Sequence, residues 1–179
     1  MVNGFSGCSS EPNTRWFAVQ TLYRHEKSVF RQLSEDGRES FVPTYRELRK
    51  WSDRQKVIET PLFPGYVFVK LGDLPSERVE VLRKPGVMSF VGNRQENSAI
   101  PDAEIENLKH LVRSGVPYTP CSYLKVGQRV RVRDGALRGL EGILVRVANE
   151  DTVVLSVDLV QRSVMVRIQG YSLDVCKAE

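Results

Sequence analysis

The sequence predicts an α+β protein of two domains, and two observations support that prediction. Strand-like and helix-like segments alternate up to about residue 115, whereas only strand-like segments follow residue 125. Between them lies VPYTPCSY, which has two prolines and no apolar periodicity and is typical of a linker. We therefore expect a disordered leader at residues 1–14, a first domain at 15–115, a linker at 116–124 and a second domain at 125–179.

The first domain is expected to form four strands and three helices. The strands are rich in β-branched and aromatic residues and read RWFAVQTLY, ESFVPTYREL, LFPGYVFVK and VMSFVG. The helices carry apolar residues at helical spacing: Val29, Phe30 and Leu33 in the first, Val79 and Leu82 in the second, and Ile105, Leu108, Leu111 and Val112 in the third. They are expected to end at Gly37, at Pro85–Gly86 and at Gly115.

The second domain is expected to contain five short strands. In VGQRVRVRDG, Val126, Val130 and Val132 alternate with polar residues, and GILVRV, TVVLSVDL, RSVMVRI and YSLDV follow. Five strands in about sixty residues are too few for a sandwich, and they suit a small barrel that leaves no strand edge exposed.

The strand LFPGYVFVK contains three aromatic residues. Alternation gives Phe63 the opposite parity to Tyr66 and Phe68, unless Pro64–Gly65 breaks the register by a bulge or bend. We expect the valines of this strand to enter the core, and Tyr66 and Phe68 to lie on the other face, where they are available to a partner. Burial of all three rings is the alternative.

Basic residues are concentrated in one short segment. The chain has a net charge of +4, and residues 45–56 hold five Lys or Arg against two Asp or Glu. Such a run can be a solvated face or a hairpin that contacts phosphates. Trp51 favours the second interpretation, because an indole on a basic loop can stack on an unpaired base.

Cysteine and histidine provide no recognisable metal or catalytic site. The three cysteines are scattered without a CxxC pair, and there are only two histidines, His25 and His110. We expect no cofactor, no metal and no enzymatic activity, because no nucleophile, base or metal constellation is present. The opening residues lack the charged and apolar regions of a signal peptide, and no apolar run is long enough to span a membrane, so we expect a reduced cytoplasmic protein.

The motifs together resemble the NusG family of transcription elongation factors, over roughly Arg15 to Val175. WFAVQ, FVPTYRE, LFPGYVFVK and LRKPGVMSFVG resemble the N-terminal (NGN) domain of that family, and VGQRVRVRDG followed by GLEGILV resembles its KOW motif. The resemblance implies an NGN domain with an antiparallel sheet flanked by helices, linked to an SH3-like β-barrel.

The resemblance also implies partners. An NGN domain lies across the RNA polymerase cleft, which suppresses pausing, and we expect Phe63, Tyr66 and Phe68 to contact the clamp helices of the largest subunit. Ser76, Glu77 and Arg78 are expected on the side of the gate loop of the second subunit. Non-template DNA is the third expected partner, and its candidate contacts are Arg24, Arg49, Lys50, Trp51, Arg54 and Lys56.

In the family, a loop of the KOW barrel binds a small-subunit ribosomal protein or the termination factor Rho, often through an aromatic residue. The corresponding stretch here consists of Leu159, Val160, Gln161 and Arg162 and has no aromatic residue. The missing aromatic residue argues more strongly against binding of Rho than against binding of the ribosomal protein. This departure favours a specialised, operon-restricted paralog over a general NusG. We expect the protein to be a monomer. A ribosome-associated KOW protein is a further alternative, but from Tyr118 onward nine Lys or Arg face seven Asp or Glu, a modest excess for an RNA binder.

In one family branch the C-terminal domain is stored as a helical hairpin. The alternating Val and Ile residues of the second domain favour strands over helices by propensity.

Overall fold

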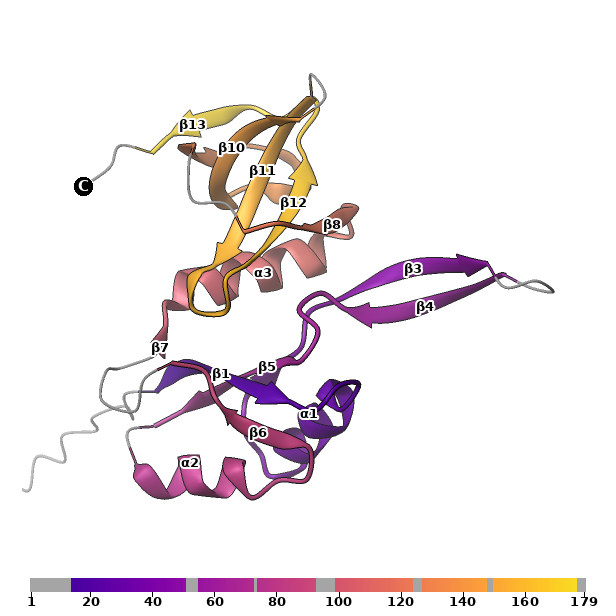
Figure 1. Cartoon of the computed structure of the whole chain (residues 1–179). Coiled ribbons are helices and arrows are strands. Elements are labelled where there is room, and N and C mark those ends of the chain that lie inside the picture. Colours follow the sequence, from indigo (N-terminus) through magenta and orange to yellow (C-terminus); the bar gives the residue numbers. More distant parts are fainter. Residues whose placement is uncertain are drawn as a thin grey trace, which may run out of the picture.

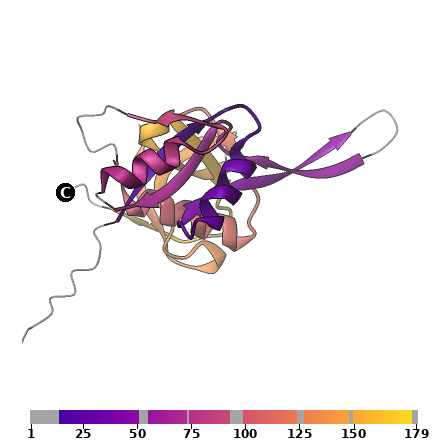
Figure 2. The ribbon, with the colours of Figure 1, turned by 90° about the horizontal axis from the view of Figure 1, so that it is seen from below.

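Figure 1 shows a computed structural model of the chain, which describes residues 14–50, 55–72, 74–92, 99–123, 127–147 and 150–176. A helix-flanked sheet occupies one end and a curled sheet the other. A long helix lies between them, and a two-stranded ribbon projects to the side (Figure 1). The second view confirms that the ribbon stands clear of the body (Figure 2).

The elements of the first half, in chain order, are β1 (Arg15–Thr21), α1 (Glu26–Glu35), β2 (Ser40–Phe41), β3 (Thr44–Lys50), β4 (Gln55–Pro61), β5 (Tyr66–Leu71), α2 (Pro75–Leu82), β6 (Val87–Phe90), β7 (Ala99–Ile100) and α3 (Asp102–Ser114). Those of the second half are β8 (Tyr118–Cys121), β9 (Gln128–Val132), the 3-10 helix η1 (Gly135–Leu137), β10 (Glu141–Val147), β11 (Glu150–Val157), the 3-10 helix η2 (Asp158–Val160), β12 (Arg162–Arg167) and β13 (Leu173–Val175).

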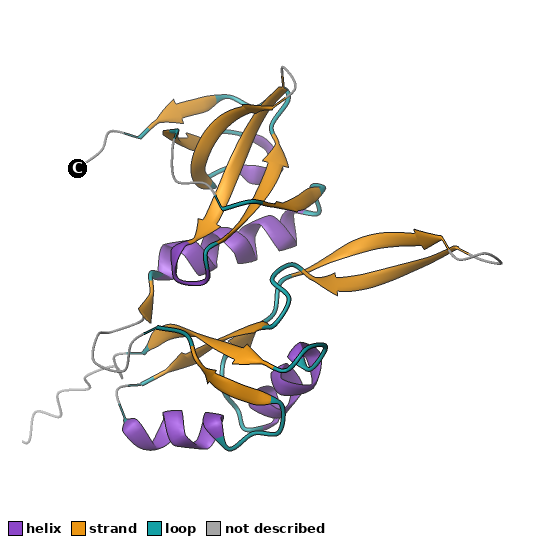
Figure 3. Ribbon diagram, in the orientation of Figure 1, coloured by secondary structure: helices purple, strands orange, loops and turns teal. Residues whose placement is uncertain are grey.

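The first sheet is antiparallel and has the strand order β2-β5-β1-β6, with β7 paired to β1. Helices α1 and α2 lie on one face and α3 on the other (Figure 3). Successive side chains of β1 point alternately to the two faces of the sheet, so the strand contributes to the core on both faces. Phe17 and Val19 pack in the cluster under α1 and α2, whereas Trp16 and Ala18 belong to the cluster that includes α3. Helix α3 ends where expected, with Gly115 in the left-handed conformation at φ 70°.

Helix α3 also contacts the second half of the chain. The side-chain oxygen of Asn107 accepts a hydrogen bond from the Glu141 amide at 3.2 Å, and Nε2 of His110 lies 3.2 Å from the Ala136 carbonyl oxygen. Buried residues of the first sheet, α3 and the curled sheet form one continuous apolar cluster. The two halves therefore share a core that is centred on α3.

The five strands expected in the second half are present as β9 to β13. The sheet has the order β13-β9-β10-β11-β12-β8, and it curls around an apolar interior to which Val130 and Val132 contribute, as the alternation predicted (Figure 1). Val126 lies outside the described residues. Part of the segment expected to be a linker forms a sixth strand, β8, because Tyr118–Cys121 pairs with β12.

The projecting ribbon consists of β3 and β4, which pair only with each other. The sequence predicted one strand over ESFVPTYREL, but the chain leaves the first sheet between β2 and β3, at Val42 and Pro43. Proline has no amide hydrogen to donate to a ladder, and the Pro43 carbonyl instead accepts the Leu62 amide at 2.8 Å. This break directs the basic segment away from the core.

Two helices differ from the expected pattern of burial. On α2, Val79 and Leu82 are 45% and 43% exposed, while Val81 is fully buried against the sheet. On α1, Val29 and Leu33 are buried, but Phe30 is 38% exposed. Helical spacing identified the helices, but it did not identify which apolar residues of α2 face the sheet.

A buried carboxylate holds the turn that precedes β5. Leu62–Gly65 is a bend rather than a strand, as Pro64–Gly65 suggested, and Gly65 has a φ of 84°. The Gly65 amide donates to Oε1 of Glu26 at 2.6 Å, and the Gly65 carbonyl accepts the Thr21 amide at 2.9 Å. Glu26 is only 3% exposed, so α1 fixes the point where β5 begins.

We predict that Glu26→Ala lowers the free energy of unfolding by about 1–3 kcal/mol, because a buried amide loses its acceptor. The matched control is Glu35→Ala on the same helix, which removes only an exposed contact with Arg31 at 3.9 Å and should change stability by less than about 0.5 kcal/mol. Urea denaturation of both variants measures the difference. Equal effects would contradict the structural role of Glu26.

Candidate functional site

The aromatic residues of LFPGYVFVK lie on the α3 side of the first sheet. The register pairs Phe68 with Ala18 and Tyr66 with Gln20, so both point to the same face, as predicted, and Val67 and Val69 are buried on the other. Phe63 is drawn from the bend to the same cluster, and its ring packs edge-on against Phe68 at 5.9 Å.

These rings do not form an open patch in this arrangement. Phe63 is 2% exposed and Phe68 is 0% exposed, because they share a cluster with Ile105 and Leu108 of α3. Of the three residues expected to contact a partner, only Tyr66 is half-buried. The expectation of an exposed Phe68 was therefore wrong, since α3 covers this face of the sheet, and Phe63, which the sequence left open, is buried as well.

Two of the three residues expected near the gate loop are used inside the fold. Oε2 of Glu77 accepts the Gly72 amide at 2.7 Å, and the Arg78 guanidinium lies 4.4 Å from the centre of the Phe17 ring. Ser76 is exposed. Ser76 can therefore contact a partner, whereas the side chains of Glu77 and Arg78 make contacts within the domain.

The candidate DNA-binding residues of the ribbon occupy neighbouring positions of its ladder. The register places Arg49 opposite Lys56, and Lys50 opposite Gln55. The Lys56 side chain is exposed. Trp51 and Arg54 lie outside the described residues.

Arg24, the remaining DNA candidate, is part of a feature that sequence reasoning missed. It adopts a left-handed conformation with φ 64°, and its guanidinium lies 5.2 Å from the centre of the Tyr23 ring. Tyr23 is 73% exposed. A cleft beside these residues runs from the start of α1 to the base of β4, where Ile58 and Thr60 contribute to its wall. The only sequence signal was an aromatic–basic pair immediately before a helix.

The loop expected to bind a second partner is partly enclosed. Val160 of η2 is 6% exposed and belongs to the core, and Leu159 packs against that core. Gln161, at φ 52°, and Arg162 are exposed. The Asp158 amide donates to Oε2 of Glu104 at 3.3 Å, so the loop lies beside the first turn of α3.

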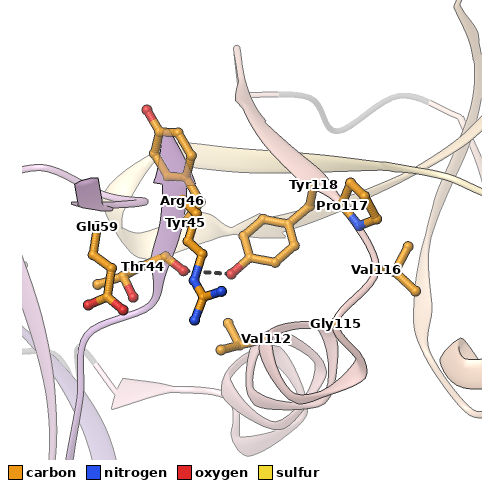
Figure 4. A pocket seen from close by; sticks show the side chains of 9 residues that line it. All are labelled: Thr44, Tyr45, Arg46, Glu59, Val112, Gly115, Val116, Pro117 and Tyr118. Carbon is orange, nitrogen blue, oxygen red and sulfur yellow. Dashed lines mark hydrogen bonds between the residues drawn. The ribbon is translucent and has the colours of Figure 1, made fainter. Parts of the chain in front are cut away.

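A second cleft, of about 570 Å³, lies where the base of the ribbon, the end of α3 and the segment before β8 meet (Figure 4). The hydroxyl of Tyr118 donates to the Thr44 carbonyl at 2.7 Å and ties β8 to the ribbon. Burial raises the pKa of Tyr118 above its usual value, so this hydroxyl stays protonated at neutral pH. Sequence reasoning missed the cleft because Tyr118 lay in the expected linker. The residues that line the cleft are Thr44, Tyr45, Arg46, Glu59, Val112, Gly115, Val116, Pro117 and Tyr118.

Among the described residues, no group of three or more His, Cys, Asp and Glu is placed to hold a metal ion. Within the same residues, no helix is long and apolar enough to cross a membrane.

An antiparallel sheet with helices on both faces, a projecting two-stranded ribbon and a small β-domain define a two-domain protein of mixed α and β structure. Comparison with known proteins supplies the family. The model for NusG, described as transcription termination factor nusG, matches residues 14–109. The chain belongs to the NusG family and is a NusG-like transcription termination/antitermination factor.

Curated relatives extend the similarity across both halves. The transcription termination/antitermination protein NusG of Lactococcus lactis is 28% identical over 176 residues, which cover 91% of this chain and 94% of that protein. NusG of Helicobacter pylori strain J99 is 31% identical over 134 residues, which cover 67% of this chain and 74% of that protein. The match to a solved structure of Thermotoga maritima NusG covers 87% of this chain and 93% of that chain, with 21% sequence identity and a TM-score of 0.49.

Proposed function

We propose that the protein binds RNA polymerase through its first domain, bridges the polymerase cleft and thereby suppresses pausing. The observation that carries the proposal is the free-standing ribbon on a domain of the NusG family. A lone two-stranded ribbon is marginally stable in water, and among the described residues this one pairs with no other strand. A partner that packs against the ribbon would stabilise it.

The polymerase contact is assigned to the aromatic layer of the first sheet. Tyr66 is its accessible member and the proposed contact for the clamp helices of the largest subunit, while Phe63 and Phe68 support it from within the core. On the other side of the domain, Ser76 is exposed, and of the three gate-loop candidates it is the one assigned to contact the gate loop of the second subunit.

Non-template DNA is assigned to the basic ribbon and to the start of α1. Phosphate contacts from Arg49, Lys50 and Lys56 would fix the strand without reading its sequence. The exposed Tyr23 ring, stacked on Arg24, offers a surface for an unpaired base. Trp51 and Arg54 remain candidates at the end of the ribbon.

The second domain is assigned to a second partner, through the exposed residues Gln161 and Arg162 and the neighbouring Leu159. A small-subunit ribosomal protein suits this loop better than Rho, because the loop has no aromatic anchor. The same feature supports an operon-specialised factor. A general NusG role is the second candidate, and the names of the curated relatives favour it.

We predict that Tyr66→Ala weakens binding of the purified chain to core RNA polymerase by about tenfold or more, as truncation of an interface aromatic residue commonly does. The control is Phe30→Ala, which removes a partly exposed ring from α1 and should leave binding unchanged. A pull-down measures both, with circular dichroism to verify folding. Failure of the wild-type chain to bind would refute the proposed function, and equal binding by the Tyr66 variant would move the contact elsewhere.

For DNA, we predict that Lys56→Gln weakens binding to a fluorescein-labelled single-stranded oligonucleotide and reduces the slope of log K against log salt by about 0.7, the value for one lost phosphate contact. Lys84→Gln is the control, because Lys84 is held by Asp36 at 2.6 Å, away from the ribbon. Fluorescence anisotropy at several salt concentrations gives both slopes. An unchanged slope for Lys56→Gln would remove the ribbon from the DNA contact.

A further inference from the structure

The cleft between the ribbon, α3 and β8 is the accessible edge of the buried aromatic layer. Tyr45, Val116 and Tyr118 pack against the cluster that contains Phe63 and Phe68, yet all three remain only partly buried. Because α3 covers Phe63 and Phe68, this cleft gives a partner access to the edge of that layer without any rearrangement (Figure 4).

A single guanidinium group projects into the cleft. The Arg46 side chain is exposed and points from β3 toward Val112 and Tyr118 (Figure 4). Some arginines of the fold are paired with a carboxylate, as Arg131 is with Glu141 and Arg38 is with Glu80. Within the described part of the chain, Arg46 has neither an ion pair nor a side-chain hydrogen bond. An unmatched guanidinium favours a ligand with a carboxylate or phosphate group.

The surroundings of Arg46 favour a carboxylate. Glu59 occupies the register position opposite Arg46 and lines the same cleft, so its repulsion is smaller for a ligand with one negative charge than for a chain of phosphates. Its carboxylate also forms an ion pair with Lys27 at 3.4 Å, so its charge is held in place. The opposite wall is apolar and consists of Val112, Val116 and Pro117. An apolar side chain next to a single carboxylate matches this combination, whereas a nucleic-acid backbone does not.

We propose that this cleft is a docking site for a polypeptide segment of RNA polymerase in which a carboxylate lies beside an apolar side chain. Arg46 binds the carboxylate in the bidentate geometry that guanidinium permits, and the wall formed by Val112, Val116 and Pro117 receives the apolar side chain. The hydrogen bond from Tyr118 to Thr44 keeps the cleft in shape. The inference rests on the proposed function and adds to it the chemistry of the partner segment.

Binding of the full-length chain to core RNA polymerase without nucleic acid tests the proposal. The variants are Arg46→Gln, which removes the charge, and Arg46→Lys, which keeps the charge but loses the bidentate geometry. Val116→Ser tests the apolar wall. The matched control is Arg113→Gln, an exposed arginine near the end of α3 that does not line this cleft. Biolayer interferometry gives the affinities, and the same variants are titrated with a single-stranded oligonucleotide.

We expect Arg46→Gln to weaken polymerase binding by about tenfold or more, Arg46→Lys and Val116→Ser to weaken it by smaller factors, and Arg113→Gln to leave it unchanged. Oligonucleotide binding should stay within about twofold for all four variants. If the wild-type chain binds polymerase and Arg46→Gln binds equally well, this inference is overturned while the proposed function stands. A matching loss of oligonucleotide binding would assign the cleft to nucleic acid and overturn it as well. Absence of polymerase binding by the wild-type chain would overturn both.

Discussion

Helix α3 is packed on two sides, and the arrangement of the rest of the chain depends on this packing. Ile105 and Leu108 join the cluster of the first sheet, while Glu104 and Asn107 bond to the curled sheet. Burial of a large aliphatic side chain contributes about 1.5–3 kcal/mol, whereas a hydrogen bond contributes about 1 kcal/mol net. Apolar packing therefore holds the two halves together, and the hydrogen bonds fix their relative orientation.

This packing explains where the functional surfaces lie. The first sheet has helices on both faces, so Phe63 and Phe68 are buried, whereas Phe41 and Tyr66 stay partly exposed and the cleft beside Arg46 opens at the edge of the layer. The ribbon leaves the first sheet at Pro43, and its base meets α3 and β8 at the cleft beside Arg46. The loop around Gln161 lies next to α3, where the Asp158 amide donates to Glu104.

Local patterns in the sequence predicted the elements well. Alternation identified the inward residues Val130 and Val132, and it placed Tyr66 and Phe68 on one face of their strand. Glycine chemistry located the end of α3 at Gly115. These features depend on neighbouring residues only, which is why a single sequence contains enough information to predict them.

Features that depend on distant residues were missed. Burial of Phe68 is decided by α3, some forty residues later in the chain, and strand β8 exists only because β12 offers an edge for pairing. On α2 the buried residue is Val81, whereas Val79 and Leu82 are exposed. Which face of the helix is buried depends on how it packs against the sheet, and the spacing of apolar residues within the helix does not determine this. The cleft and the Tyr23–Arg24 pair arise from such long-range contacts, and the pattern of one strand or helix does not encode them.

The central claim is that α3 joins both halves into one body, and ¹⁵N relaxation of the backbone amides in solution tests it most directly. The account predicts one rotational correlation time for the amides of residues 15–114 and 127–176, as expected for a single particle of 20.3 kDa. Two distinct and shorter correlation times, one for each half, would show that the halves tumble independently and would contradict the shared core.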